Sequence, residues 1–386
     1  MDRRSFIRLV GGGVVVAATG PINGCSLSSD YPDEVIEPWR SPDRETDTRR
    51  FMLAHALLAP NPHNRQPWIA DLRESNRIHL FCDGERLLPE TDPFGRQILI
   101  GCGAFIELAV IAAAQRGVAA GVELFPDGTP ADQQLPMGSR VATLVVGETG
   151  TAPSDSLFAQ IVRRHTRKSA YAMDRPLPEE VVRSWVESAS GFGLRSGVVS
   201  GPAAMDTIRR ITREAYEIEA TTARTWLESA RLMRIGPSAI AANPDGISLN
   251  SLMVRALHAV GVFDPMEVPA KGSKSLQRVM DRWIPFETAS GFLWLASPTN
   301  TRIMQVNTGR AYVRAHLLAT EAGVDMHPLS QALQEFPEMR GPREAIHQSL
   351  GLGVAGETLQ MLSRVGFATE ARGPSPRRSV ESILRT

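Results

Sequence analysis

The chain has 386 residues, of which 42% are hydrophobic and 22% are charged, the composition of an ordinary folded globular protein. Its 42 basic and 42 acidic side chains balance, which excludes a global electrostatic attraction to nucleic acid or to an anionic membrane. The three cysteines, Cys25, Cys82 and Cys102, are too few and too scattered for a disulfide framework or a zinc site. Cys82 and Cys102 could pair in an oxidising compartment, but each lies in an apolar stretch and is better explained as a small buried side chain.

The first 25 residues are typical of an export signal. Arg3 and Arg4 precede a large apolar residue and a further basic one, and the apolar stretch 9–20 that follows is too short to span a bilayer. This pattern resembles the twin-arginine motif, whose export machinery carries proteins that are already folded; an ordinary secretory signal is the alternative. A sequence that resembles a lipobox ends at Cys25, where cleavage would leave a lipidated N-terminus; a chance cysteine near a cleavage site is the alternative. We therefore expect a periplasmic protein, tethered to the membrane through a lipid anchor if Cys25 is modified.

The first half of the mature chain begins after a predicted linker. Residues 26–47 are rich in Ser, Pro, Asp and Glu, which is typical of a spacer. Apolar residues at helical spacing begin at Thr48 and end at Pro60. A short strand (IHLFCD), a long helix from Ile98 to Ala114 that is apolar on most sides, and a strand (ATLVVGE) follow. The first half therefore covers residues 48–150.

The second half, residues 151–386, repeats this pattern around an insertion. The sequence predicts a helix over 155–171, a buried strand over 292–298, a buried helix over 310–322 and an apolar helix over 359–367. A long and mostly helical insertion covers about residues 205–285. In both halves an apolar helix runs into a Gly-Val turn, which indicates an ancient duplication.

The segment 59–68, APNPHNRQPW, is the most informative part of the sequence. Its prolines stop the preceding helix and make the loop rigid. The amides of Asn61, Asn64 and Gln66 carry both donors and acceptors, which suits the edge of a flat heteroaromatic ring. The alternative is a helix-ending turn whose side chains satisfy their own backbone. His63 is the one acid–base candidate in the loop and is equally well explained as a structural residue.

Two basic clusters follow. In RRHTRK (163–168), arginine forks and a threonine hydroxyl suit a terminal phosphate, although cations at a solvated helix end would look the same. The second cluster, PSPRR (374–378), taken alone is typical of a solvated basic tail.

Together with GVDMHPLSQ (323–331), these motifs resemble the nitroreductase family in order and type, from about residue 45 to the end. The most similar branch is the Acg-like group, in which two nitroreductase-like halves lie in one chain. The resemblance implies an α+β fold with central, mostly antiparallel sheets flanked by helices, in two similar halves. It also implies a monomer, because the dimer interface of ordinary family members would lie inside this pseudo-dimer.

By this resemblance the chain binds FMN. The FMN phosphate would be held by residues of the two basic clusters: Arg164, His165, Thr166, Arg167, Lys168, Arg377 and Arg378. The edge of the ring would be met by the loop: Asn61, Pro62, His63, Asn64 and Gln66. Near N5 the ring would be covered by Pro328, Leu329, Ser330 and Gln331. Arg96, in the helix start DPFGRQILIGCGA, is a further cofactor-binding candidate.

The sequence departs from the family pattern at several of these positions. Asn61 and Pro62 stand where serines are usual, and Ser330 and Gln331 stand where many relatives have an acid and a glycine. The first half lacks its own RHTRK cluster, so we expect a single composite site.

The resemblance implies an FMN-dependent oxidoreductase with ping-pong kinetics. A small-molecule electron donor would transfer a hydride to N5 of FMN and leave. A nitroaromatic, a quinone or a similar acceptor would then bind in the place of the donor. The alternative is a protein that stores or sequesters FMN without turnover, with the insertion as a lid over the pocket. We expect no nucleic-acid partner.

Overall fold

The computed structural model describes residues 30–352, 356–370 and 373–385, and from Tyr31 on the chain forms one compact unit. The predicted export signal over residues 1–25, including Cys25, lies outside the described residues.

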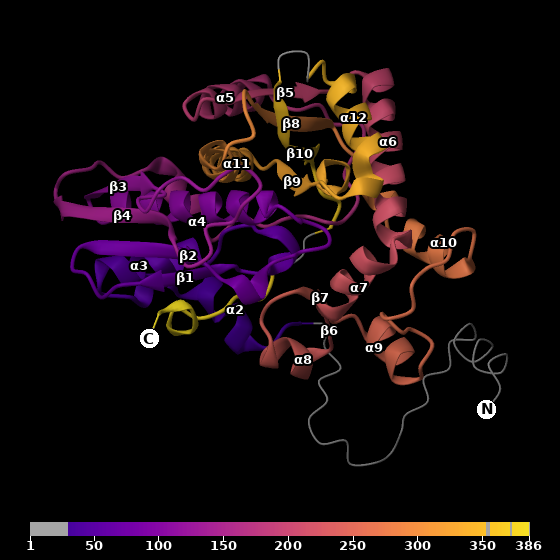
Figure 1. Cartoon of the computed structure of the whole chain (residues 1–386), viewed down its shortest axis with the longest axis horizontal. Helices are drawn as coiled ribbons and strands as arrows, with labels where there is room; N and C mark the ends of the chain where they lie inside the picture. The colour runs from indigo at the N-terminus through magenta and orange to yellow at the C-terminus, as the bar shows by residue number, and fades with distance from the viewer. Residues whose placement is uncertain (1–29, 353–355, 371–372, 386) are drawn as a thin grey trace, which may run out of the picture. The chain divides into compact units, whose positions relative to one another are not determined.

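The first half contains a four-stranded antiparallel sheet. Its strands are β1 (Trp68–Asp71), β2 (Arg77–Cys82), β3 (Val118–Leu124) and β4 (Arg140–Thr149), in the order β1-β2-β4-β3. The helices α3 (Thr48–Ala56) and α4 (Arg96–Gln115) pack on each other and share the apolar core of this half with the sheet (Figure 1). The predicted strands IHLFCD and ATLVVGE and the predicted long helix are confirmed.

The second half contains another four-stranded antiparallel sheet. Its strands are β5 (Arg195–Val199), β8 (Gly291–Ser297), β9 (Asp325–Pro328) and β10 (Thr358–Gly366), in the order β5-β8-β10-β9. The helices α5 (Glu179–Ser190) and α11 (Arg302–Glu321) cover it, and Trp185 of α5 donates a hydrogen bond to the Ala315 carbonyl at 2.9 Å. The strand predicted over 292–298 is confirmed as β8.

The two halves have the same order of main elements and the same sheet topology. Each runs through a helix, two strands, a 20-residue helix and two more strands, apart from the insertion, the short elements and the helix over Arg340–Ser349 between the last two strands of the second half. If the four strands of each half are numbered along the chain, both sheets have the spatial order first, second, fourth, third. All neighbouring strands in both sheets are antiparallel.

The helices α4 and α11 pack on each other between the halves, and two glycines permit their contact. A Cβ on Gly103 would lie 1.9 Å from the Val306 carbonyl oxygen, and one on Gly309 would lie 1.8 Å from that of Ile100. No other residue type fits at such a distance. Among the described helices α4 alone is long and apolar enough to cross a membrane, but 83% of its most apolar window is buried, as in the core helix of a folded domain.

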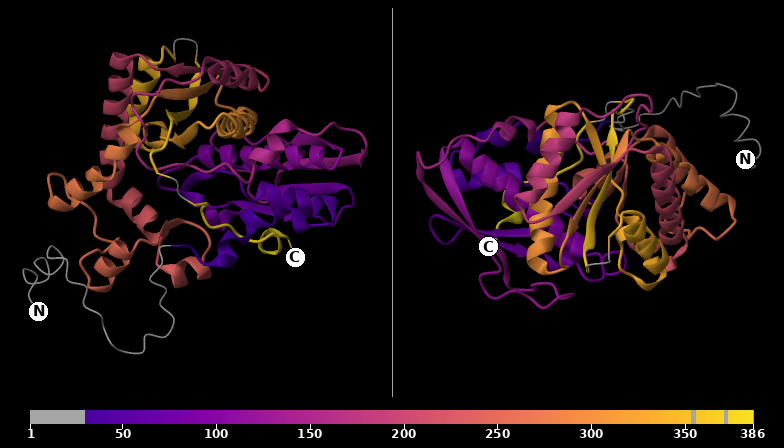
Figure 2. Two further views of the ribbon diagram at one scale, coloured as in Figure 1. Left: turned by 180° about the vertical axis from the view of Figure 1, so that it is seen from behind. Right: turned by 90° about the horizontal axis from the view of Figure 1, so that it is seen from above.

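The insertion between β5 and β8 is mostly helical, as expected over about 205–285. Its elements are α6 (Pro202–Thr221), α7 (Ala223–Arg231), β6 (Met233–Ile235), α8 (Pro237–Ala242), β7 (Ile247–Leu249), α9 (Leu252–Ala259) and α10 (Lys274–Asp281). A last helix, α12 (Arg340–Ser349), packs on α6. Figure 2 shows the insertion leaving the second sheet along α6 and extending beside the first half.

The C-terminal tail belongs to the second half in sequence but lies on the first half (Figures 1 and 2). Arg377 N donates to the Val35 carbonyl at 2.9 Å, and Arg385 N donates to that of Ala70 of β1 at 2.8 Å. Trp39 Nε1 donates to the Ser375 carbonyl at 2.8 Å. The tail therefore joins α2 to the edge of the first sheet.

The linker predicted over 26–47 is wrong for its described part. Residues Asp33–Arg40 form the helix α2, whose Val35, Ile36 and Trp39 are buried. The prediction followed the polar composition of the segment. It overlooked these three apolar residues, which lie at helical spacing directly after the acids Asp33 and Glu34 of the first turn.

Two predicted helices are also wrong. Over 155–171 only the 3-10 helix Ser156–Gln160 forms, and the chain then runs through turns to Thr166, which makes a parallel bridge with Met326. The segment 359–367 lies in and just after the strand β10. This strand has neighbours on both edges and most of its side chains are buried, so its apolar run shows neither the strand nor the helix period. The helix predicted over 310–322 exists but already begins at Arg302, as α11.

Candidate functional site

The loop between α3 and β1 has a strained backbone. His63, Asn64 and Gln66 have φ angles of 48°, 51° and 50°, a left-handed conformation that residues other than glycine rarely adopt. Each such residue costs about 1–3 kcal/mol and persists only where the surroundings enforce it. Inside the loop, Asn61 Oδ1 accepts a hydrogen bond from Gln66 N at 2.7 Å. Such strain is common at functional sites.

The other loop amides join the loop to two distant segments. Asn64 Oδ1 accepts from Arg377 Nη1 at 2.7 Å, and Asn64 Nδ2 donates to the Pro376 carbonyl at 3.0 Å. Gln66 Oε1 accepts from Arg378 N at 2.8 Å, and Gln66 Nε2 donates to the Pro244 carbonyl at 2.7 Å. These amides thus have partners within the chain, as the alternative interpretation of the loop required, and their assignment to the edge of a ring stays a prediction.

Two buried arginines lie next to this loop. Arg164 is 1% exposed and donates from Nη2 to the Leu58 carbonyl at 2.7 Å. Arg377 is 4% exposed and donates from Nη2 to the same carbonyl at 3.4 Å. Both guanidinium groups lie near Trp39, at 5.7 and 5.0 Å from its ring centroid. The RHTRK cluster and the tail therefore meet at the loop of the first half.

This arginine pair has no carboxylate partner among the residues that the structure describes. Burial lowers the pKa of Arg164 to about 10, and burial together with the charge of Arg164 lowers the pKa of Arg377 to about 9. Both therefore stay charged at neutral pH. The Nε atoms of both arginines and Nδ1 of His165 are buried without a hydrogen-bond partner.

Two histidines next to the pair are neutral. Burial, followed by the charges of Arg164 and Arg167, lowers the pKa of His165 to about 3. The pKa of His316, which contacts Arg164 Nη1 at 3.5 Å, is lowered well below its usual value by burial and by Arg164. Buried charges without a counter-charge are costly, so this arrangement favours an anion that can accept several hydrogen bonds.

The RHTRK segment does not act as one cluster. Arg163, His165 and Arg167 line a polar cavity of about 250 Å³ next to α11, and Arg167 Nε lies 3.4 Å from Asp325 Oδ1. Lys168 instead acts on His63. Burial, followed by the positive charge of Lys168, lowers the pKa of that histidine to about 4. Thr166 bridges to β9. Of the five predicted phosphate residues in this segment, only Arg164 belongs to the buried pair.

Two other predicted phosphate or cofactor residues lie elsewhere. Arg96 donates to the carbonyls of Gln360 and Leu333, each at 2.8 Å, and its Nε lies 3.3 Å from Glu335 Oε2, so its charge is already balanced. Arg378 turns away from the arginine pair, with Nη1 3.3 Å from the Gln66 carbonyl and 4.0 Å from Asp83 Oδ2. Each guanidinium group therefore already has acceptors within the chain, and the assignment of these two residues to the cofactor site stays a prediction.

The PLSQ segment follows β9 and contacts the insertion. Pro328 is paired with Ser363 of β10, and the buried Leu329 donates its N–H to the Leu362 carbonyl at 2.8 Å. Ser330 precedes the 3-10 turn Gln331–Leu333, and Gln334, directly after this turn, donates from Nε2 to Glu219 Oε2 of α6 at 2.9 Å. This segment is therefore supported by α6 from the insertion.

The insertion also covers the loop 59–68. Asp245 Oδ2 accepts from Arg65 Nη1 at 2.9 Å and from Arg86 Nη1 at 2.7 Å. His63 Nε2 and Ser229 Oγ of α7 are hydrogen bonded at 3.1 Å. Together with the bond from Gln66 to Pro244, these contacts close the insertion over the loop.

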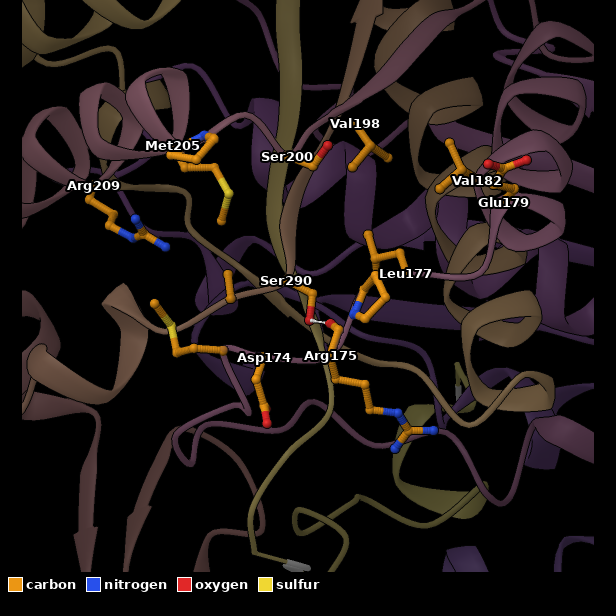
Figure 3. Close-up of a pocket in the computed structure, with 14 residues that line it drawn as sticks. Asp174, Arg175, Leu177, Glu179, Val182, Val198, Ser200, Met205, Arg209 and Ser290 are labelled. Atoms are coloured by element: carbon orange, nitrogen blue, oxygen red, sulfur yellow. Dashed lines mark hydrogen bonds between the residues drawn. The ribbon is translucent and has the colours of Figure 1, made fainter.

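A larger cavity, of about 690 Å³, lies elsewhere in the second half (Figure 3). It is enclosed by the loop 173–179, the end of β5 and the start of α6, and Figure 3 shows Leu177, Val198 and Met205 around it. It shares no lining residue with the arginine pair or with the predicted site.

The sequence is similar to proteins from Mycobacterium tuberculosis (strain ATCC 25618 / H37Rv). It is 27% identical over 348 residues, 88% of this chain and 92% of the relative, to the protein named "Putative NAD(P)H nitroreductase Rv3131". Over 82 residues, 21% of this chain and 24% of the relative, it is 40% identical to "Putative NAD(P)H nitroreductase acg". The chain is related to these nitroreductases. No family model matches it.

Among solved structures, the chain is similar to the FMN-dependent nitroreductase NfnB from Mycobacterium smegmatis in complex with NADPH. The TM-score is 0.37 and the identity 19%, over 59% of this chain and 96% of that chain.

Three residues of the site were not found in the sequence. Trp39 lies under both arginines in a segment interpreted as a linker, although its spacing from Val35 and Ile36 is a helical signal. His316 of α11 and Asp245 of the insertion carry no local motif. They reach the site only through tertiary packing.

Proposed function

We propose that the chain is an FMN-binding oxidoreductase of the nitroreductase type. The observation that carries this proposal is the pair Arg164 and Arg377, which are buried, charged and without a carboxylate partner in the described part of the chain. A phosphate would balance both charges and accept hydrogen bonds from their free Nε–H groups. The relationship to proteins named as NAD(P)H nitroreductases supports the same function.

The residues present fit the phosphate end of FMN. Arg164 and Arg377 would hold the phosphate, with Trp39 excluding water beneath them. Ring contacts of Asn64 and Gln66 are not needed for this assignment, since their amides are bonded within the chain. When bound, FMN would supply two-electron hydride chemistry between a reduced nicotinamide and a nitroaromatic, quinone or similar acceptor.

We further propose that the chain is a monomeric pseudo-dimer with one composite site. The shared element order and sheet topology of the halves support a duplication. The site combines Leu58 and the loop of the first half with Arg164 and Arg377 of the second. The first half lacks its own arginine cluster, so one site per chain is expected.

Flavin content of the purified protein tests this function. We expect a yellow protein that releases FMN on denaturation, and loss of most of this flavin in Arg377→Gln. Arg378→Gln is the matched control: it removes the neighbouring tail arginine, which faces Asp83 instead of the pair. A colourless wild-type protein that cannot be loaded with FMN would contradict the proposal, as would equal flavin retention in both variants.

A second candidate function is storage of FMN without turnover. The observation that favours it is the closed insertion, which contacts the loop through Ser229, Pro244 and Asp245. A lid fixed in this way would keep an electron donor away from the flavin.

Reduction by a nicotinamide donor separates the two functions. Under anaerobic conditions, NADH or NADPH should bleach the visible flavin absorbance of a reductase within its turnover time. A storage protein should stay yellow and should begin to bleach in Asp245→Asn, which removes the charge that pairs with Arg65, Arg86 and Arg234. A wild-type protein that stays yellow would contradict the reductase function. A variant that also stays yellow would contradict the closed insertion as the cause.

A further inference from the structure

Exposed apolar side chains gather in one segment of the insertion. Of the eleven large apolar side chains that are exposed among the described residues, five lie close together in sequence: Leu252, Met253, Val260, Val262 and Met266. Each is 43% to 60% exposed, and α9 contains no buried residue. Single exposed hydrophobic residues are normal, but a cluster of this kind marks an interaction surface.

We call this segment, residues 251–266, the α9 projection. Ser251 Oγ accepts a hydrogen bond from Val254 N at 3.3 Å and so caps α9 at its start. At its other end the Pro265 carbonyl accepts from Trp226 Nε1 of α7 at 2.9 Å. The apolar side chains are therefore presented by a helix that is anchored at both ends.

Basic residues outnumber acidic ones in the stretch of sequence that begins with this projection, although the chain as a whole carries no net charge. Between residues 251 and 282 there are five basic side chains and three acidic ones: Arg255, Lys271, Lys274, Arg278 and Arg282 against Asp264, Glu267 and Asp281. Lys271 and Lys274, two of the three lysines in the sequence, are both exposed. Exposed apolar side chains and an excess of cations in one stretch of sequence are typical of elements that bind a lipid surface.

The described chain begins next to the α9 projection. Val35 and Ile36 of α2 pack against Ile240 of α8. Gly236, which precedes α8, lies against the Arg255 side chain of α9. Figure 1 shows α8 and α9 next to each other in the same part of the molecule. The residues N-terminal to Tyr31 therefore join the folded unit on the part that carries the projection.

The sequence before Tyr31 supports a lipid bilayer as the partner of the α9 projection. Five residues separate Cys25, the candidate lipidation site, from Tyr31. The six peptide links from Cys25 to Tyr31 span at most about 20 Å. A lipid on Cys25 would therefore keep the α9 projection close to a membrane.

We propose that the α9 projection docks on the surface of an anionic bilayer. Its apolar side chains would enter the boundary between headgroups and acyl chains, and Arg255, Lys271 and Lys274 would contact lipid phosphates. This proposal is independent of FMN binding, because it uses no residue of the arginine pair or the loop.

Amide hydrogen exchange of the full-length protein tests the proposal. Exchange is measured by mass spectrometry in buffer, with vesicles of phosphatidylcholine, and with vesicles of phosphatidylcholine and phosphatidylglycerol. We expect slower exchange within residues 251–266, most strongly with the anionic vesicles. Unchanged exchange in this segment while the protein sediments with the vesicles would assign binding to the N-terminal residues and overturn the proposal.

A pair of double variants provides the matched comparison. Met253→Ser with Val260→Ser should weaken binding to anionic vesicles about tenfold or more and abolish the slower exchange. Met173→Ser with Val186→Ser, at side chains that are 59% and 41% exposed elsewhere on the protein, should change neither. Slower exchange that grows with protein concentration without vesicles would assign the surface to a second copy of the chain and overturn the proposal.

Discussion

Arg164 and Arg377 differ from Arg364 and Arg96, two other buried arginines, in how their charge is compensated. Arg364, which is fully buried, is bonded through all three nitrogens, to His327 and to the carbonyls of Pro285, Thr288, Arg167 and Ser169. Arg96 has a carboxylate in Glu335. Arg164 and Arg377 have neither a complete set of acceptors nor an acid among the described residues. An anionic ligand would supply the missing acceptors and counter-charge of Arg164 and Arg377. Arg364 and Arg96 already have their acceptors within the chain, as structural residues do.

Glu219 gives the stability of the protein a defined pH dependence. Burial raises the pKa of this carboxyl to about 7, so the folded state keeps its proton where the unfolded chain releases it. Stability should therefore fall as the pH rises from about 4.5 to 7, by about 3 kcal/mol for this group. Unfolding by urea at pH 5 and pH 8 measures this loss.

Glu219→Gln should remove this part of the pH dependence and stabilise the protein at pH 8. Its amide can donate to Gln331 Oε1 or Gln334 Oε1, both of which are buried without a partner. Asp92, whose pKa burial raises to about 6, contributes in the same direction in both proteins and cancels in the comparison. An unchanged difference between pH 5 and pH 8 in the variant would contradict the assignment.

At the same scale, the sequence predicted part of the site. Arg164 and Arg377 were predicted because the arginines of two motifs suit phosphate, whichever element carries them; the structure brings them together, and their contact with a phosphate stays a prediction. The sequence does not show that Arg96 and Arg378 already have the acids Glu335 and Asp83 beside them. A residue type indicates what a side chain can bind, but only packing decides whether its partner already lies in the chain.

At the scale of elements, the crossing of α4 and α11 depends on glycine. In Gly309→Ala the new Cβ would meet the Ile100 carbonyl oxygen at 1.8 Å, and backbone atoms cannot rotate away. The helices would have to separate, which should cost about 1–3 kcal/mol or more of unfolding free energy. Urea denaturation measures this loss.

Gly341→Ala in α12 is the control for this substitution. A Cβ added at Gly341 would have no described atom within 4 Å, so alanine should stabilise the helix by up to about 1 kcal/mol. Similar effects of the two substitutions would contradict the close crossing of α4 and α11.

Elements with a clear apolar pattern were predicted best. The helix α4 and the strands β2, β4 and β8 lie where the sequence placed them. The strand β10 was not recognised, because side chains buried on both of its faces conceal its period. Composition concealed the helix α2 in the same way, since three buried side chains are outnumbered by polar neighbours.

At the scale of the whole molecule, the export signal expected in the first 25 residues predicts where the protein is found in the cell. Arg3→Lys with Arg4→Lys should leave the chain in the cytoplasm, because the motif requires the arginine pair. Arg40→Lys with Arg44→Lys should not change its location. Cys25→Ser should move the exported protein from the membrane to the soluble periplasmic fraction. Cell fractionation measures all three, and export of the first variant would contradict the twin-arginine route.

The position of Arg377 in the chain has a consequence for the order of events during synthesis. The arginine pair is complete only after the tail has been made and has crossed to α2 and the first sheet. A growing chain with both sheets but without the tail would hold Arg164 alone. Cofactor loading would therefore follow translation and precede transport, and export machinery that accepts only folded proteins would act on the loaded form.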